Sequence, residues 1–119
     1  VSEDLTQKGI ALYNSKKFKP ALATFEQVLQ QDPSANKALE YAGMSALQLK
    51  EYETALKHFR QLSALKGLYE NRGPFLEATT LLMRDESNDK ENAERLLKQV
   101  VSAGLFGSAE AQQWLKKFE

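Results

Sequence analysis

The chain has 119 residues, of which 42% are hydrophobic and 27% are charged, and it contains no cysteine. This is the size and composition of one ordinary soluble domain, which can bury enough surface to fold without disulfides or metals. The absence of cysteine excludes disulfide scaffolds and thiolate sites for zinc or iron. Sixteen basic and sixteen acidic residues give a net charge of zero, so no overall field favours nucleic acid or an anionic membrane surface.

No apolar run approaches the roughly 18 residues that a membrane-spanning helix requires. The N-terminal segment VSEDLTQKG is too polar for the core of a signal peptide. Because the sequence begins with Val1 rather than Met, a signal or an anchor could precede it. We therefore expect a soluble domain, cytoplasmic or periplasmic, that could belong to a larger anchored protein.

The sequence repeats itself at a constant offset of 34 residues, which is the distance from Leu5 to Leu39. Such an offset indicates a repeat architecture. At this offset nine pairs of residues match in class: Leu5 with Leu39, Gly9 with Gly43, Ile10 with Met44, Phe18 with Tyr52, Ala21 with Ala55, Leu22 with Leu56, Phe25 with Phe59, Val28 with Leu62, and Pro33 with Gly67.

Each unit has the pattern of two short amphipathic helices. In the first unit Leu5, Gly9 and Leu12 are spaced for one helix, and residues 21–29 carry the apolar positions of the next. A glycine inside a helix costs up to about 1 kcal/mol, so its recurrence predicts a close approach of two helices. We expect the aromatic residue of the second helix to fill the adjacent space. Pro33 ends the second helix, and Ser34 is predicted to cap the third.

These residues and their offset resemble the tetratricopeptide repeat, a 34-residue helix-turn-helix unit with a small residue in the first helix, alanine and an aromatic residue in the second, and a closing proline. The chain departs from that pattern at the closing proline of the second unit, where Gly67 stands, and at the first-helix tyrosine, where Leu12 and Ala46 stand. The structural repeat positions are Leu5, Gly9, Ala21, Phe25, Pro33, Leu39, Gly43, Ala55, Phe59, Ala93 and Leu97.

A third unit is stretched, because Ala55 and Phe59 recur as Ala93 and Leu97, four positions later than the repeat would place them. We place the four extra residues in the linker 66–74 and the polar turn 84–92, which leaves a first helix at roughly 74–84. Ala78 would be its small contact residue. The segment 108–119 is predicted to form a final helix, capped by Ser108, that closes the array with a polar outer face.

The resemblance implies an all-α, right-handed superhelix, a solenoid of about seven helices in one domain, 1–119. Its parts are repeat one (2–35), repeat two (36–69), an irregular repeat three (70–107) and a capping helix (108–119). A looser likeness is to repeat modules at the ends of membrane-anchored bacterial envelope proteins.

The sequence offers little for catalysis. The single histidine, His58, has no cysteine partner, no HExxH motif and no GxSxG turn, so it is interpreted as a surface or packing residue. Asp85, Ser87, Asp89 and Glu91 imitate the start of a calcium loop, but Lys90 replaces the turn glycine and Leu96 the closing glutamate. We therefore expect a polar turn, in which Asn88 or Asp89 caps the next helix, and neither metal nor cofactor.

A nucleic-acid role would need clustered basic residues around aromatic side chains. The aromatic candidates are Tyr13, Tyr41, Tyr52, Tyr69 and Phe75, but acidic residues interleave with most of the lysines and arginines. We therefore expect no nucleic-acid partner.

The resemblance implies that the first helix of each pair lines a concave face that binds a peptide. Carried over by position, the candidate groove residues are Thr6, Ile10, Tyr13, Lys37, Glu40, Met44, Leu47, Phe75, Thr79, Leu82 and Met83. Some members of the family grip a C-terminal carboxylate with Lys, Asn and Arg side chains. Here Thr6, Ile10 and Tyr41 occupy such places and only Lys37 is similar, so a grip of that kind is not expected. For Ile10 and Leu47, packing between helices is an equal alternative.

Two functions follow from the sequence. The first is a non-catalytic protein-protein interaction module or scaffold that binds a peptide or protein segment in the groove. The alternative is a structural or oligomerisation segment of a larger, membrane-anchored bacterial envelope protein, with self-association in place of a separate ligand. No direct membrane insertion of this segment is expected.

Overall fold

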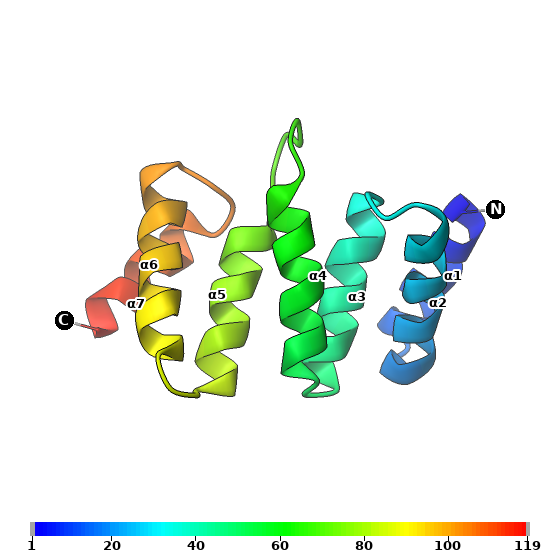
Figure 1. Cartoon of the computed structure of the whole chain (residues 1–119), viewed down its shortest axis with the longest axis horizontal. Coiled ribbons are helices and arrows are strands. Elements are labelled where there is room, and N and C mark those ends of the chain that lie inside the picture. Colours follow the sequence, from blue (N-terminus) through cyan, green and yellow to red (C-terminus); the bar gives the residue numbers. More distant parts are fainter. Residues whose placement is uncertain (1, 119) are drawn as a thin grey trace.

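The computed structural model describes residues 2–118, which form α-helices joined by turns and contain no strand. The helices are α1 (Ser2–Asn14), α2 (Phe18–Gln31), α3 (Asn36–Gln48), α4 (Tyr52–Ala64), α5 (Gly73–Arg84), α6 (Asp89–Ser102) and α7 (Ser108–Lys117). Figure 1 shows them side by side along an axis 47 Å long. The prediction of an all-α chain of helical hairpins is confirmed. None of the helices within 2–118 is long and apolar enough to span a bilayer.

Each helix packs on the next one in the chain, so the array is built by nearest neighbours. The turns inside the three pairs lie along one long edge of the array, and the connections between pairs lie along the opposite long edge (Figure 1). In this view α1 lies behind α2 and α7 behind α6. The first helices also meet each other at α1 and α3.

The sequence repeat is visible in the backbone itself. Lys16 and Lys50, which stand one repeat apart, both have the left-handed conformation, with φ of 62° and 61°. In the turn after α1 the Lys17 amide donates to the Leu12 carbonyl at 2.9 Å, and Glu51 donates to Ala46 at the same distance. This is the closing hydrogen bond of a Schellman motif, which satisfies a carbonyl at the end of α1 and of α3.

The two helix glycines are covered by aromatic rings. A Cβ atom placed on Gly9 would lie 2.6 Å from Phe25 Cε1, and one on Gly43 would collide with the Phe59 ring. Both phenylalanines are fully buried. The predicted close approach is therefore real, and contact with the ring compensates for the low helix propensity of glycine.

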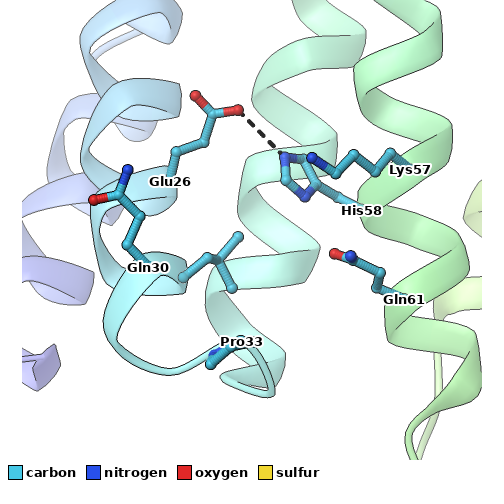
Figure 2. A pocket seen from close by; sticks show the side chains of 7 residues that line it. Glu26, Gln30, Pro33, Lys57, His58 and Gln61 are labelled. Carbon is cyan, nitrogen blue, oxygen red and sulfur yellow. Dashed lines mark hydrogen bonds and ion pairs between the residues drawn. The ribbon is translucent and has the colours of Figure 1, made fainter.

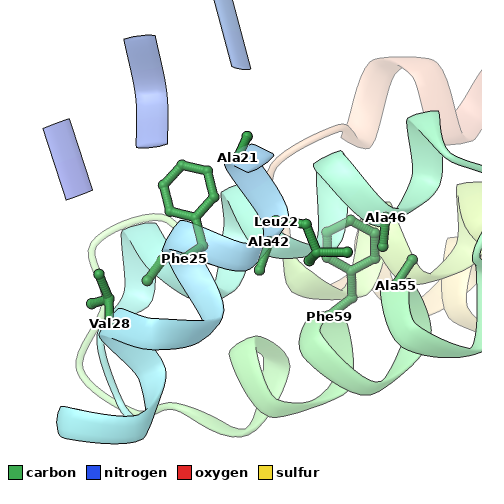
Figure 3. Close-up of a cluster of buried hydrophobic side chains, with 9 residues drawn as sticks. Ala21, Leu22, Phe25, Val28, Ala42, Ala46, Ala55 and Phe59 are labelled. Atoms are coloured by element: carbon green, nitrogen blue, oxygen red, sulfur yellow. The ribbon is translucent and has the colours of Figure 1, made fainter. Parts of the chain in front are cut away.

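The buried side chains form two clusters. The first gathers around Phe25 and Phe59 and includes alanines of α2, α3 and α4 (Figure 3). The second gathers around Leu81, Leu97 and Val100 and joins α5, α6 and α7. Ala78 and Leu97 both lie in this second cluster. That Ala78 takes the place of the glycine of units one and two stays a prediction.

The stretched connection before the third unit is residues 65–72, and α5 begins at Gly73, one residue before the predicted start. Asn71 joins the two helices: its Nδ2 donates to the Leu62 carbonyl at 2.9 Å, and its Oδ1 accepts from the Gly73 amide at 2.8 Å. Gly73 is also needed for close packing, since a Cβ there would lie 2.6 Å from the Ser63 amide nitrogen.

Two predicted helix caps are wrong. Ala35, not Ser34, is the N-cap of α3, because Ser34 turns back and its amide donates to Asp32 Oδ1. Gly107 is the N-cap of α7, and the Ser108 hydroxyl instead donates to the carbonyls of the preceding turn. Asn88 does occupy the N-cap position of α6, but its side chain makes no capping hydrogen bond.

We expect Gly43→Leu to lower the free energy of unfolding by about 2 kcal/mol or more, because the new side chain must displace the buried Phe59 ring. Ala23→Leu is the matched control, since Ala23 is exposed in the middle of α2 and should change stability by less than about 0.5 kcal/mol. Urea titration of both variants measures the difference. Equal midpoints for Gly43→Leu and the unchanged chain would contradict the assigned contact.

Candidate functional site

The candidate residues on α1 and α3 are brought together by aromatic contacts. The ring of Tyr13 packs edge-on against Tyr41 with centroids 5.4 Å apart, and Tyr41 stacks on Phe25 at 5.6 Å. Ile10, Met44 and Leu47 are half-buried against the same core cluster. The result is a partly exposed apolar strip, which we call the α1–α3 strip and define as Ile10, Tyr13, Tyr41, Met44 and Leu47.

The polar groups of this strip are the hydroxyls of Tyr13 and Tyr41. Partial burial raises the pKa of Tyr13 above its ordinary value of 10.0. The phenol therefore stays protonated at neutral pH and can donate a hydrogen bond. An apolar strip with tyrosine hydroxyls as donors can bind an apolar side chain and a backbone carbonyl together.

A further candidate, Glu40, is bound by an arginine that the sequence analysis did not select. Arg72, at the start of α5, donates to Glu40 on α3 at 3.1 Å. Its guanidinium also lies 4.6 Å from the centre of the Phe106 ring in the α6–α7 turn. Glu40 is thus an ion-pair partner that links α3 to α5.

The candidates on α5 lie in different surroundings. Phe75 contacts Phe106 edge-on at 6.0 Å and covers Gly107, so its ring belongs to the packing of the third unit. The Thr79 hydroxyl donates to the Phe75 carbonyl of its own helix at 3.0 Å. Leu82 is half-buried against the second cluster, whereas Met83 is half-exposed.

Two candidates remain at the side of the strip: Lys37 is exposed, and Thr6 is half-buried with a partner of its own. The structure therefore joins the α1 and α3 candidates into one surface and separates the α5 candidates from it. Two residues that contact these candidates went unselected by sequence reasoning, Arg72 and Phe106. The sequence feature that could have indicated them is their position, since each directly precedes a glycine in one of the two irregular connections.

A separate pocket of about 350 Å³ lies between the second helices α2 and α4 (Figure 2). We call it the α2–α4 pocket. Figure 2 shows His58 of α4 pointing toward Glu26 of α2, and its Nε2 lies 3.4 Å from Glu26 Oε2. His58 is only 4% exposed, so its interpretation as a packing residue is confirmed and a surface position is excluded. The pocket is lined by Glu26, Leu29, Gln30, Pro33, Lys57, His58 and Gln61.

Burial lowers the pKa of His58 below its ordinary value of 6.5, although the neighbouring Glu26 carboxylate opposes this and Lys57 reinforces it. At neutral pH the ring is therefore uncharged. An uncharged ring has one N–H, and the geometry assigns it to Nε2, which faces an acceptor-only carboxylate.

The residues that resemble a calcium loop are held by an arginine. Asp89 is buried and receives two hydrogen bonds from Arg84, at 2.8 and 2.9 Å, and one from the Glu86 amide at 2.8 Å. These bonds lower the pKa of Asp89 from 3.8 to about 2. Within residues 2–118 no three His, Cys, Asp or Glu side chains gather as metal ligands. Asp89 thus belongs to a buried ion pair, whereas the sequence predicted it to lie in a polar, solvated turn.

The sequence matches no family model and no curated protein. Among solved structures, one similar chain is the Yersinia enterocolitica type III secretion translocator chaperone SycD, in a crystal structure described as an alternative dimer. The two are 20% identical in sequence and superpose with a TM-score of 0.80 over 98% of this chain and 89% of that one. The chain thus has the helical-hairpin fold found in that chaperone.

His58 gives a stability change at mildly acidic pH. The unfolded chain takes up a proton near pH 6.5, whereas the folded chain resists it because the His58 pKa is lowered. Stability should therefore fall as the pH drops below 6.5 and level off once the folded ring is also protonated. We expect urea midpoints between about pH 7 and about pH 5 to show this slope and His58→Gln to lose it. Parallel slopes for both chains would contradict the assignment.

Asp89 gives a separate change at strongly acidic pH. Its contribution is complete above pH 3.8 and is lost as the pH falls from there to about 2. At neutral pH, Asp89→Asn removes the buried carboxylate and leaves Arg84 with only the exposed Glu86 at 3.5 Å, so we expect a loss of roughly 2 to 3 kcal/mol in unfolding free energy. Asp85→Asn, in the exposed part of the same turn, is the control and should be nearly neutral. A similar loss in both variants would show that the turn, and not the pair, was disturbed.

Proposed function

We propose that this chain is a non-catalytic protein-interaction module of the tetratricopeptide-repeat type that binds a peptide or protein segment along its first helices. The observation that carries the proposal is the α1–α3 strip. It keeps five apolar or aromatic side chains partly exposed on adjacent helices, next to a protonated tyrosine hydroxyl.

The arrangement fits an extended or helical peptide that presents one or two apolar anchors. Aromatic residues and methionine are the residue types enriched in the centre of protein interfaces. The exposed Lys37 lies beside the strip on α3 and adds a positive charge, so an acidic group near the anchors would be favourable. The solved protein that has the similar fold is named a chaperone, which is a protein-binding role, and this supports the proposal.

A non-catalytic role is supported by the surroundings of the titratable groups. The one histidine of the chain is buried beside Glu26, and the buried Asp89 is fully engaged by Arg84 and a backbone amide. The groups with shifted pKa values therefore stabilise the array instead of assembling a reactive site.

The proposal is tested by selecting peptides from a displayed random library on the 119-residue chain and measuring their binding by fluorescence anisotropy. We expect the double substitution Tyr13→Ala and Met44→Ala to weaken a selected peptide by more than about tenfold, since interface anchors contribute about 1 kcal/mol or more each. Tyr69→Ser, outside the strip, is the control and should bind as the unchanged chain does.

Because both side chains also pack on the core, the double variant is first checked by urea titration. Lys37→Glu provides a second variant that leaves the core intact, because Lys37 is exposed, and it should weaken acidic peptides only. Selected peptides that bind all these variants equally well would remove the site from the first helices.

A further inference from the structure

The connection between α4 and α5, residues 65–72, is built as a projecting loop. Figure 1 shows it projecting beyond the other connections along the same long edge of the array. At its tip Tyr69 is fully exposed, with an exposed fraction of 103%. Gly67 adopts the left-handed conformation, with φ of 81° and nothing within contact range of its missing side chain.

The base of this α4–α5 loop is fixed while its tip is free. Asn71 Nδ2 reaches the carbonyls of Leu62, Ser63 and Leu65, so both ends of the loop are held to the end of α4. A loop fixed in this way presents its tyrosine outward at little further cost in conformational entropy. An exposed tyrosine on a rigid support is typical of an interface anchor.

The α2–α4 pocket complements this loop. Along the loop a base, two apolar side chains and an acid follow one another: Lys66, Leu68, Tyr69 and Glu70. The pocket offers the opposite set, namely an acid, two apolar surfaces and a base: Glu26, Leu29, Pro33 and Lys57. Its volume of about 350 Å³ is sufficient for a tyrosine side chain, and the half-exposed Glu26 carboxylate can accept from a phenol.

The loop and the pocket are neighbours on one molecule. Gln61 lines the pocket, and the loop begins at Leu65, one helical turn or about 6 Å further along α4. Asn71 holds the loop upright, so Tyr69 is presented to another molecule and not to its own pocket. When two complementary patches adjoin, a two-fold axis between them brings each into contact with the other, and the assembly closes as a dimer.

We propose that the α4–α5 loop binds a second copy of this chain, with Tyr69 of each copy inserted in the α2–α4 pocket of the other. In this dimer Glu70, which lies 3.6 Å from Arg72 in its own chain, also lies against Lys57 of the opposite copy. The surface is separate from the α1–α3 strip, so a dimer of this kind leaves the strip free. The contact is small, and small interfaces of this class are weak, so the dimer should form only at high protein concentration.

The test is light scattering of the 119-residue chain over a hundredfold concentration range that reaches about 1 mM, the regime of weak interfaces. We expect the mass to rise from 13.4 kDa toward twice that value. Tyr69→Ser should hold the mass at 13.4 kDa, because this side chain makes no contact within its own chain that could be lost on substitution. Met83→Ser, the other exposed large apolar residue, is the matched control and should still dimerise.

A charge exchange tests the register. Lys57→Glu and Glu70→Lys should each abolish the dimer through like-charge contacts, and the chain with both substitutions should recover it. Recovery would establish that these two residues meet across the interface.

Four results would overturn the proposal. A mass of 13.4 kDa for the unchanged chain at the highest concentration would exclude self-association. Dimers of undiminished stability after Tyr69→Ser, or failure of the charge exchange to restore them, would place the interface elsewhere. A mass that rises well beyond that of a dimer would show an open chain of copies in place of a reciprocal exchange.

Discussion

The contact between a helix glycine and a buried phenylalanine determines how the hairpins of this protein pack. At Gly9 and Gly43 the missing side chain is the space that Phe25 and Phe59 occupy, so the distance between the helices of a pair is fixed by the thickness of one ring. Every later helix is placed by its neighbour. An error in this distance would therefore be carried along the array.

The third unit meets the same packing requirement with other residues. Ala78 and Leu97, both in the second cluster, are the predicted counterparts of that glycine and phenylalanine, and the two pairs have about the same total volume. Where the glycine contact recurs, its parts are exchanged: Phe75 comes from the first helix and Gly107 from a turn. Asn71 stabilises the longer connection, because its side chain forms hydrogen bonds with the end of α4 and the start of α5.

The fold could be predicted because its signals are local and repeated. A glycine, an alanine and a phenylalanine that recur once in each of the first two units define the hairpin, and α5 was placed within one residue. The caps at Ser34 and Ser108 were wrong because a serine near a helix start has several acceptors and donors within reach.

The candidate site was predicted only in part. Periodicity assigns a residue to a helix face, so the α1 and α3 candidates were found together, apart from Tyr41, which was noted only as an aromatic residue and as a place in the carboxylate grip. Arg72 and Phe106, which turn Glu40 and Phe75 into packing residues, come from irregular connections where no period operates. Contacts between residues far apart in sequence, such as Glu26 with His58 and Glu40 with Arg72, likewise depend on the finished array.

Helix α4 contributes buried side chains to both core clusters. Phe59 belongs to the first cluster and Leu56, three residues earlier on the same helix, belongs to the second. Loss of the second cluster would expose one side of α4 and leave the other side packed, so the chain has a structural basis for opening from its C-terminal end while α1 to α4 remain folded. A ligand on the first helices would strengthen only the N-terminal half. The two halves of this small protein are coupled through α4, through Leu76 of α5, which packs on the first cluster, and through the ion pair of Arg72 with Glu40.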